Sequence, residues 1–297
     1  MRFLLAIPIL LAACGPGPFD WERYAMNAQE AGLMRQDRAP IDAPYSNEDL
    51  IAAFEKIAFS FEADPFETGE AAPERPEIIR KVVNGPSFLV LNPDNRSRAI
   101  LVNRMRRYLD RLAGLTGLTP QVYTSVDEFR SARDNESLIF VLQTDEEEFK
   151  KLSDVEAASD VIERGRVAQW FSEAVASWRR SRSPCGGRLI VSTGANPERP
   201  KGEILFVFLM FREGLPDIVL EGCIEEEFAQ VLGLFNDDPT LRPSIFNDDD
   251  EFSRLTTHDE ALLRLLYHPR IKPGMAKPEA MAIIRDLLAQ GEIEAGS

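Results

Sequence analysis

The sequence predicts an α+β domain, because β-type runs and amphipathic helical stretches follow one another without internal repeats. The run Ile204–Phe211, I-L-F-V-F-L-M-F, has the composition most typical of a strand. Residues 97–114 place apolar side chains on one helical face and arginines on the other. At 297 residues and 33.4 kDa, the chain can bury a sizeable core.

Spacing and turn residues locate the elements in order. We expect strands at 78–83, 87–91, 120–124, 137–143, 187–192 and 203–211, and helices at about 48–62, 97–114, 256–267 and 278–290. Asn47 is expected to cap the first helix, and Gly117 to end the second. Thr256 or Thr257 is expected to cap the third, and Pro278 lies in the first turn of the last. The charged interval 144–184 is interpreted as a helical insertion.

The start of the chain resembles a bacterial lipoprotein signal. Phe3–Leu11 is apolar but too short to span a bilayer, and Leu11-Ala12-Ala13-Cys14 matches a lipobox. Cleavage after residue 13 would leave Cys14 to carry a diacylglycerol and a further palmitate-type chain, which gives stable membrane anchoring. A plain secretory signal with a chance cysteine is the alternative. Gly15 after the lipidated residue favours the outer membrane, facing the periplasm, over the inner membrane.

The rest of the chain divides into a tether and one domain. Residues 14–44 are polar, contain several prolines and show no apolar period, so we expect a flexible tether. Residues 45–297 are then one domain. A net charge of −15 argues against binding to a phosphate backbone, so no nucleic acid is expected as a partner.

In an oxidising compartment the two cysteines left besides Cys14, Cys185 and Cys223, predict a disulfide. It would close a loop of 38 residues (223 − 185). The alternative is a thiolate nucleophile at Cys223, at the start of a helix, but that requires a nearby histidine base.

The segment Cys223–Asp238, C-I-E-E-E-F-A-Q-V-L-G-L-F-N-D-D, is called the motif segment. It resembles the zinc helix of metzincin peptidases, H-E-x-x-H-x-x-G-x-x-H-D, with every histidine replaced. Glu226, Gln230 and Asn236 stand at the three ligand positions. Glu227 stands at the general-base position, and Gly233 and Asp237 match the family's glycine and aspartate.

The resemblance extends over about residues 86–268. It implies a zincin-like mixed twisted sheet with a backing helix, a motif-bearing helix and C-terminal helices. Phe246, in Pro243–Phe246, stands where the family has its Met-turn methionine, and Leu255–Tyr267 resembles the closing helix. At closer range the chain is similar to proteobacterial envelope proteins known as a domain of unknown function, family twenty-nine twenty-seven. Its matching features include Ser183-Pro184-Cys185 and Cys223–Asp237.

A zinc site is not expected from these residues. The chain has only two histidines, His258 and His268, both after the motif segment and expected at the surface or at a cap. One carboxylate and two amides favour Ca²⁺ or Mg²⁺ over Zn²⁺, so we expect neither a bound metal nor another cofactor. The acidic run 247–251 lacks the spacing of a calcium loop and is interpreted as a solvated loop.

Three interpretations of Glu225–Glu227 remain open. They are first-turn acidic residues stabilised by the helix dipole, part of a polar cleft, or a reassigned metal or carboxylate site. A cleft would bind an extended peptide or a glycan, with main-chain pairing along the strand edge 203–211. The sequence thus predicts a lipid-anchored periplasmic scaffold or binding module for a protein, peptide or glycan. The alternative is a hydrolase that uses Glu226 and Glu227, with or without a metal other than zinc.

Overall fold

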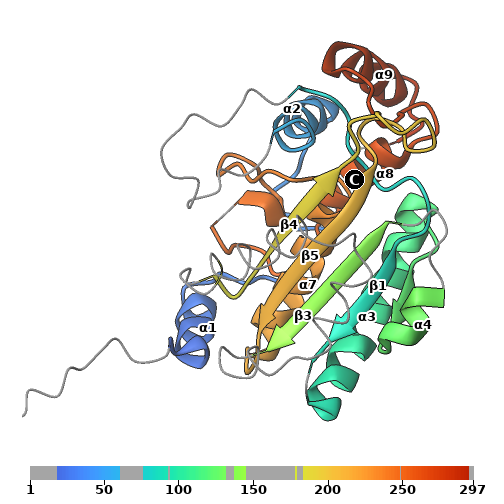
Figure 1. Cartoon of the computed structure of the whole chain (residues 1–297). Helices are drawn as coiled ribbons and strands as arrows, with labels where there is room; N and C mark the ends of the chain where they lie inside the picture. The colour runs from blue at the N-terminus through green and yellow to red at the C-terminus, as the bar shows by residue number, and fades with distance from the viewer. Residues whose placement is uncertain are drawn as a thin grey trace, which may run out of the picture.

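The computed structural model describes residues 19–60, 76–92, 94–131, 137–144, 178, 183–247 and 249–293 (Figure 1). The signal peptide expected at 1–13, the lipidation expected at Cys14 and nearly all of the insertion expected at 144–184 lie outside these residues. Among the described helices, none combines the length and the apolar character needed to cross a bilayer.

A five-stranded mixed sheet forms the centre of the molecule, in the order β2-β1-β3-β5-β4. β2, β1, β3 and β5 are parallel, whereas β4 runs antiparallel to β5. The strands are β1 Ser87–Leu91, β2 Gln121–Tyr123, β3 Leu138–Thr144, β4 Cys185–Val191 and β5 Ile204–Arg212. The α+β class predicted from the sequence is confirmed.

Two strand predictions need correction. β5 is an interior strand, since β3 pairs with one side of it and β4 with the other. The edge for peptide pairing expected on 203–211 is therefore occupied, and β4 is the last strand on that side within the described sheet. Residues 78–83 form no strand but make isolated bridges, Ile78 with Ala276 and Lys81 with Glu203.

The described helices pack around this sheet. They are α1 Trp21–Glu30, α2 Asn47–Ile57, α3 Asn95–Thr116, α4 Val126–Ser131, α7 Asp217–Gln230, α8 Thr257–Tyr267 and α9 Lys277–Ala289, with a 3₁₀ turn at Ile245–Asn247. α3 ends at Gly117, whose φ of 72° suits glycine, as predicted. Ser46 rather than Asn47 caps α2, because Ser46 and Asp49 form a reciprocal capping box.

The core has two parts, one on each face of the sheet. The larger part joins the sheet to α2, α3, α7 and α8, and the smaller contains Phe129 and Trp178. Successive β5 residues alternate between them, with Leu209 in the larger part and Phe208 in the smaller. Phe228 of α7 is fully buried, and its ring centroid lies 5.1 Å from that of Phe88 in β1. This contact fixes the side of α7 that faces the sheet.

The expected tether 14–44 is ordered and docked wherever the structure describes it. We call residues 19–44 the N-terminal arm. It contains α1, and its backbone bonds to the segment before α8: the Met34 amide donates to Asp250 O at 2.7 Å and the Thr257 amide to Arg38 O at 2.7 Å. The prediction of a flexible tether was wrong for these residues. It was based on the lack of a periodic apolar pattern, but long-range backbone hydrogen bonds and ion pairs hold the arm on the domain instead.

Candidate functional site

The helix that carries the motif segment begins earlier than predicted. α7 starts at Asp217 after Pro216 at the N-cap, so Cys223 lies in its middle and Glu225–Glu227 lie in its C-terminal half. The helix dipole is unfavourable to carboxylates there. The first-turn interpretation of these glutamates was therefore wrong, and other groups must stabilise their charge.

Glu225 is held by an arginine of the N-terminal arm. Arg38 donates to both of its carboxylate oxygens, at 2.7 and 3.1 Å, and the Leu255 amide donates to Oε2 at 2.8 Å. Glu225 is only 7% exposed. Burial raises the pKa of Glu225 above its ordinary value, while the charge of Arg38 opposes that rise. The pair thus joins the arm to the motif helix through a buried charge.

The three ligand positions point to different partners. The Gln230 amide donates to both carboxylate oxygens of Asp237, at 3.3 Å each, and the Asn236 amide donates to Lys56 O at 3.3 Å. Glu226, which is partly exposed, lies close enough to Tyr24 of α1 for its charge to raise the pKa of that phenol, after the larger effects of burial and Asp250. An amide binds metal ions through its oxygen, a hard donor that suits Ca²⁺ or Mg²⁺ better than Zn²⁺. These side chains do not fit a zinc ion.

The described part of the chain offers no alternative metal site built from His, Cys, Asp or Glu. No three or more His, Cys, Asp or Glu side chains there are grouped in a way that could hold an ion. The acidic run is engaged by protein groups instead: Glu251 binds two arginines and Asp250 accepts from Tyr24. The interpretation of this run as a solvated loop agrees with the exposed Asp249 and Asp250, whereas Glu251 is partly buried between the two arginines.

The disulfide predicted between Cys185 and Cys223 is present, with an S–S distance of 2.06 Å. It joins the first residue of β4 to the middle of α7. Since Cys223 is oxidised and 3% exposed, the thiolate-nucleophile alternative is wrong.

Glu227, at the general-base position of the motif segment, lies beside β4. A Cβ placed on Gly187 would lie 3.3 Å from Glu227 Oε2 and only 2.6 Å from Leu209 Cδ2. Cys223 and Glu227 are about one helical turn apart, roughly 6 Å, and Cys185 and Gly187 are about as far apart along a strand. The disulfide and the Glu227–Gly187 approach therefore hold α7 alongside β4. The glycine leaves room for the buried carboxylate.

Asp259 organises the turn at the Met-turn position. This fully buried carboxylate accepts from Ser244 Oγ at 2.6 Å, from the Ile245 amide at 3.1 Å and from both the amide and the hydroxyl of Thr256. Thr256 caps α8, as predicted. Phe246 is fully buried, and its carbonyl accepts from the Asp238 amide at 2.9 Å. The turn is thus packed against the end of the motif segment.

The two histidines differ in environment. His258 is 2% exposed and packs edge-on against Tyr45, with ring centroids 5.0 Å apart, so its expected place at the surface was wrong. His268 is the C-cap residue of α8, as predicted, and its Nε2 lies 3.4 Å from Glu292.

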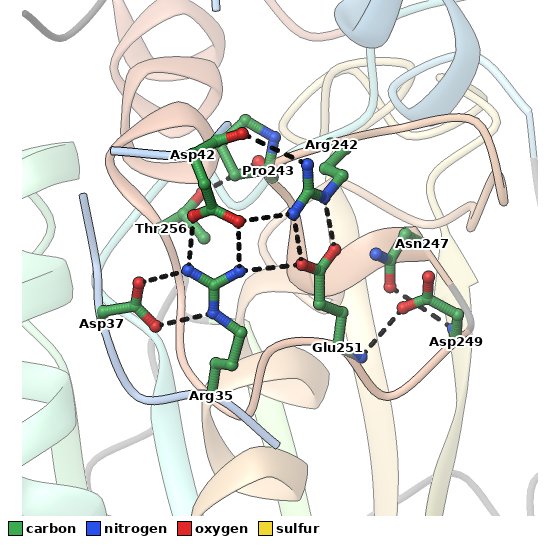
Figure 2. A network of polar contacts seen from close by, with 9 residues as sticks. All are labelled: Arg35, Asp37, Asp42, Arg242, Pro243, Asn247, Asp249, Glu251 and Thr256. Carbon is green, nitrogen blue, oxygen red and sulfur yellow. Dashed lines mark hydrogen bonds and ion pairs between the residues drawn. The ribbon is translucent and has the colours of Figure 1, made fainter. Parts of the chain in front are cut away.

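A charge network that the sequence analysis missed holds the N-terminal arm (Figure 2). Arg35 binds Asp37 and Asp42, each through two hydrogen bonds, and also Glu251 at 3.0 Å. Arg242 binds Glu251 through two hydrogen bonds and Asp42 at 2.9 Å. These arginines hold the pKa of all three carboxyls below the ordinary values. The alternation of arginine and aspartate in residues 35–42 was the only local signal of it.

One comparison with known proteins gave a match. The family model described as a protein of unknown function, DUF2927, matches residues 47–286, which include the sheet, α7, α8 and most of α9. No curated protein and no solved structure matched the chain. The match covers most of the 297 residues. The chain therefore belongs to the DUF2927 family.

Proposed function

We propose that this protein is a metzincin-like domain that has lost its zinc site and works as a lipid-anchored binding or scaffold module in the periplasm. The order of elements supports the metzincin-like part: strand, long helix, further strands with one antiparallel edge strand, and then the motif helix directly after β5. The turn at Phe246 and the closing helix α8 follow in the same order.

One observation carries the non-catalytic part of the proposal. The amides of Gln230 and Asn236 donate to Asp237 and to Lys56 O, so different partners hold the two side chains, and they offer only amide oxygens in place of imidazole nitrogens. Without histidines at these positions, most of a zinc affinity of roughly 10–16 kcal/mol would be lost. Without a polarised water, Glu227 has no proton to remove as a zinc-peptidase base.

The binding part of the proposal concerns the side of the sheet formed by β4. An extended peptide that added to this strand would gain main-chain hydrogen bonds, and Glu227 lies beside its glycine. The disulfide at Cys185 fixes the strand to α7, which would present a preorganised edge to a periplasmic protein, peptide or glycan. Acylation of Cys14 would keep the domain at the membrane, with the outer membrane as the proposed location.

Elemental analysis of the purified protein, together with a Glu227→Gln variant, tests this proposal. We expect less than stoichiometric zinc, calcium and magnesium after dialysis, and no hydrolysis of peptide or glycan libraries by either protein. Glu226→Gln tests the second candidate carboxylate, and Glu279→Gln, which changes an exposed glutamate of α9, is the control.

A hydrolytic activity that Glu227→Gln abolishes while the fold is intact would establish the alternative, a hydrolase that uses Glu226 and Glu227. A stoichiometric metal that the substitutions of Glu226 and Glu227 both weaken would also contradict the proposal.

A further inference from the structure

Three aromatic rings gather at the N-terminal end of α1. The centroids of Phe19 and Trp21 lie 4.4 Å apart, and Tyr24 lies 5.9 Å from Phe19 and 5.7 Å from Trp21. We call these residues the aromatic cluster. Phe19 is 43% exposed although its ring lies tilted against those of Trp21 and Tyr24, and it is one of the few large exposed apolar side chains among the described residues.

The cluster is held on a fixed element. Asp20 caps α1 by accepting from the Arg23 amide at 3.0 Å, and Ala25 and Ala28 are buried against the domain. The Tyr24 hydroxyl donates to Asp250. Figure 1 places α1 at one end of the molecule and α9 at the other. The cluster therefore lies at one end of the domain, where Tyr24 packs against the core, Trp21 is partly exposed and Phe19 is exposed.

The length of chain before the cluster limits where its rings can lie. Phe19 follows Cys14 by five residues. A fully extended chain covers at most about 3.6 Å per residue, so the two α-carbons are separated by no more than about 18 Å. The polar headgroup region occupies roughly 5–7 Å on each side of a bilayer. This argument rests on the proposed acylation of Cys14.

We propose that the aromatic cluster is a membrane-contact surface, with Phe19 and Trp21 in the headgroup region of the bilayer in which Cys14 is anchored. Tryptophan and tyrosine favour this region because they combine an apolar ring with one polar group. The cluster and the lipid together would fix two points of the domain, so that the α1 end faces the bilayer and the α9 end faces away from it.

The charges around the cluster indicate the kind of membrane. Asp20, Glu22 and Arg23 are exposed beside the rings, so the acidic groups outnumber the basic one there, and the whole chain carries a net charge of −15. An anionic surface would repel this end of the domain. The surface that fits the cluster is therefore a zwitterionic one.

Fluorescence quenching in vesicles tests the proposal. The acylated protein is reconstituted into phosphatidylcholine vesicles whose acyl chains carry bromine close to the headgroup, and its tryptophan emission is compared with that in vesicles without bromine. We expect bromine to remove the emission of Trp21, so that Trp21→Phe loses most of the quenching. Phe19→Ser should reduce the quenching, whereas Ile41→Ser, which changes a 99% exposed apolar residue elsewhere on the arm, should not.

Equal quenching of the parent protein and Trp21→Phe overturns the proposal. So does a dimer, or a complex with another protein, that buries the cluster while the protein is on the vesicle. The mass of the N-terminal peptide tests acylation separately. Acylated Cys14 without quenching of Trp21 rejects the cluster proposal and leaves the anchor in place. Quenching without acylation, after vesicles are added, supports the membrane-contact surface without the anchor.

Discussion

Arg38 of the N-terminal arm binds the buried carboxylate of Glu225 through two hydrogen bonds, although 187 residues separate them in the chain. The same guanidinium donates to Leu255 O at 3.0 Å, and the Leu255 amide donates to Glu225. Arm, motif helix and the segment before α8 therefore meet at one charge pair.

Replacing Arg38 with methionine should lower the free energy of unfolding by about 3–5 kcal/mol at neutral pH, because it leaves an unpaired buried charge. Burial already raises the pKa of Glu225 in the folded protein. Protonation removes the uncompensated charge, so the loss should shrink as the pH falls toward the ordinary glutamate value of about 4.3. Urea unfolding at several pH values measures both effects.

The double variant Arg38→Met, Glu225→Gln is the control for this pair. It should recover part of the lost stability and lose most of the extra pH dependence. A loss from Arg38→Met that is the same at neutral and acidic pH would contradict the buried-charge explanation.

Removing the disulfide should lower the free energy of unfolding by about 3–4 kcal/mol, since the bridge closes a loop of 38 residues in the unfolded chain. The variant is Cys185→Ser, Cys223→Ser, measured by denaturant unfolding with and without reductant. Reductant should shift the midpoint of the parent protein toward that of the variant and leave the variant unchanged. A parent protein that does not respond to complete reduction argues against a stabilising bridge.

Gly187→Ala should destabilise the fold by about 1–3 kcal/mol through overpacking. The new methyl group would lie 2.6 Å from Leu209 Cδ2 and 3.3 Å from Phe208 O and Glu227 Oε2. Gly186→Ala is the matched control on the same strand, because the nearest atom to its Cβ would be Trp178 Cδ1 at 4.0 Å. Thermal unfolding of the two variants compares them. Equal melting temperatures would show that β4 does not approach α7 as described.

Asp259→Ala should lower the free energy of unfolding by about 3 kcal/mol or more, because it leaves several buried hydrogen-bond donors without an acceptor. Asp49 occupies the same position in the capping box of α2, but its hydrogen bonds with Ser46 are exposed. Asp49→Ala should therefore lower the free energy of unfolding by only about 1 kcal/mol. Denaturant unfolding of both variants measures the contrast, and comparable losses would contradict the buried role of Asp259.

Much of the local structure was predictable because its causes are local. The apolar stripe of α3, the cap at Thr256 and the β composition of residues 204–211 depend on near neighbours in the chain. The disulfide was predictable because the expected lipidation of Cys14 would leave Cys185 and Cys223 as the remaining pair. The early start of α7 also had a local signal, Pro216 followed by Asp217, which the resemblance to the zinc helix obscured.

The sequence by itself determined the α+β class, the family, the disulfide and the lack of histidines at the motif positions. Tertiary structure alone decided that β5 is an interior strand, that residues 19–44 are docked and that Gln230 and Asn236 bond away from each other. The physical reason is distance along the chain. Helix periods and caps are set by residues three or four apart, whereas Arg38 binds Glu225, 187 residues away, and Arg35 binds Glu251, 216 residues away, so no local pattern predicts these two pairs.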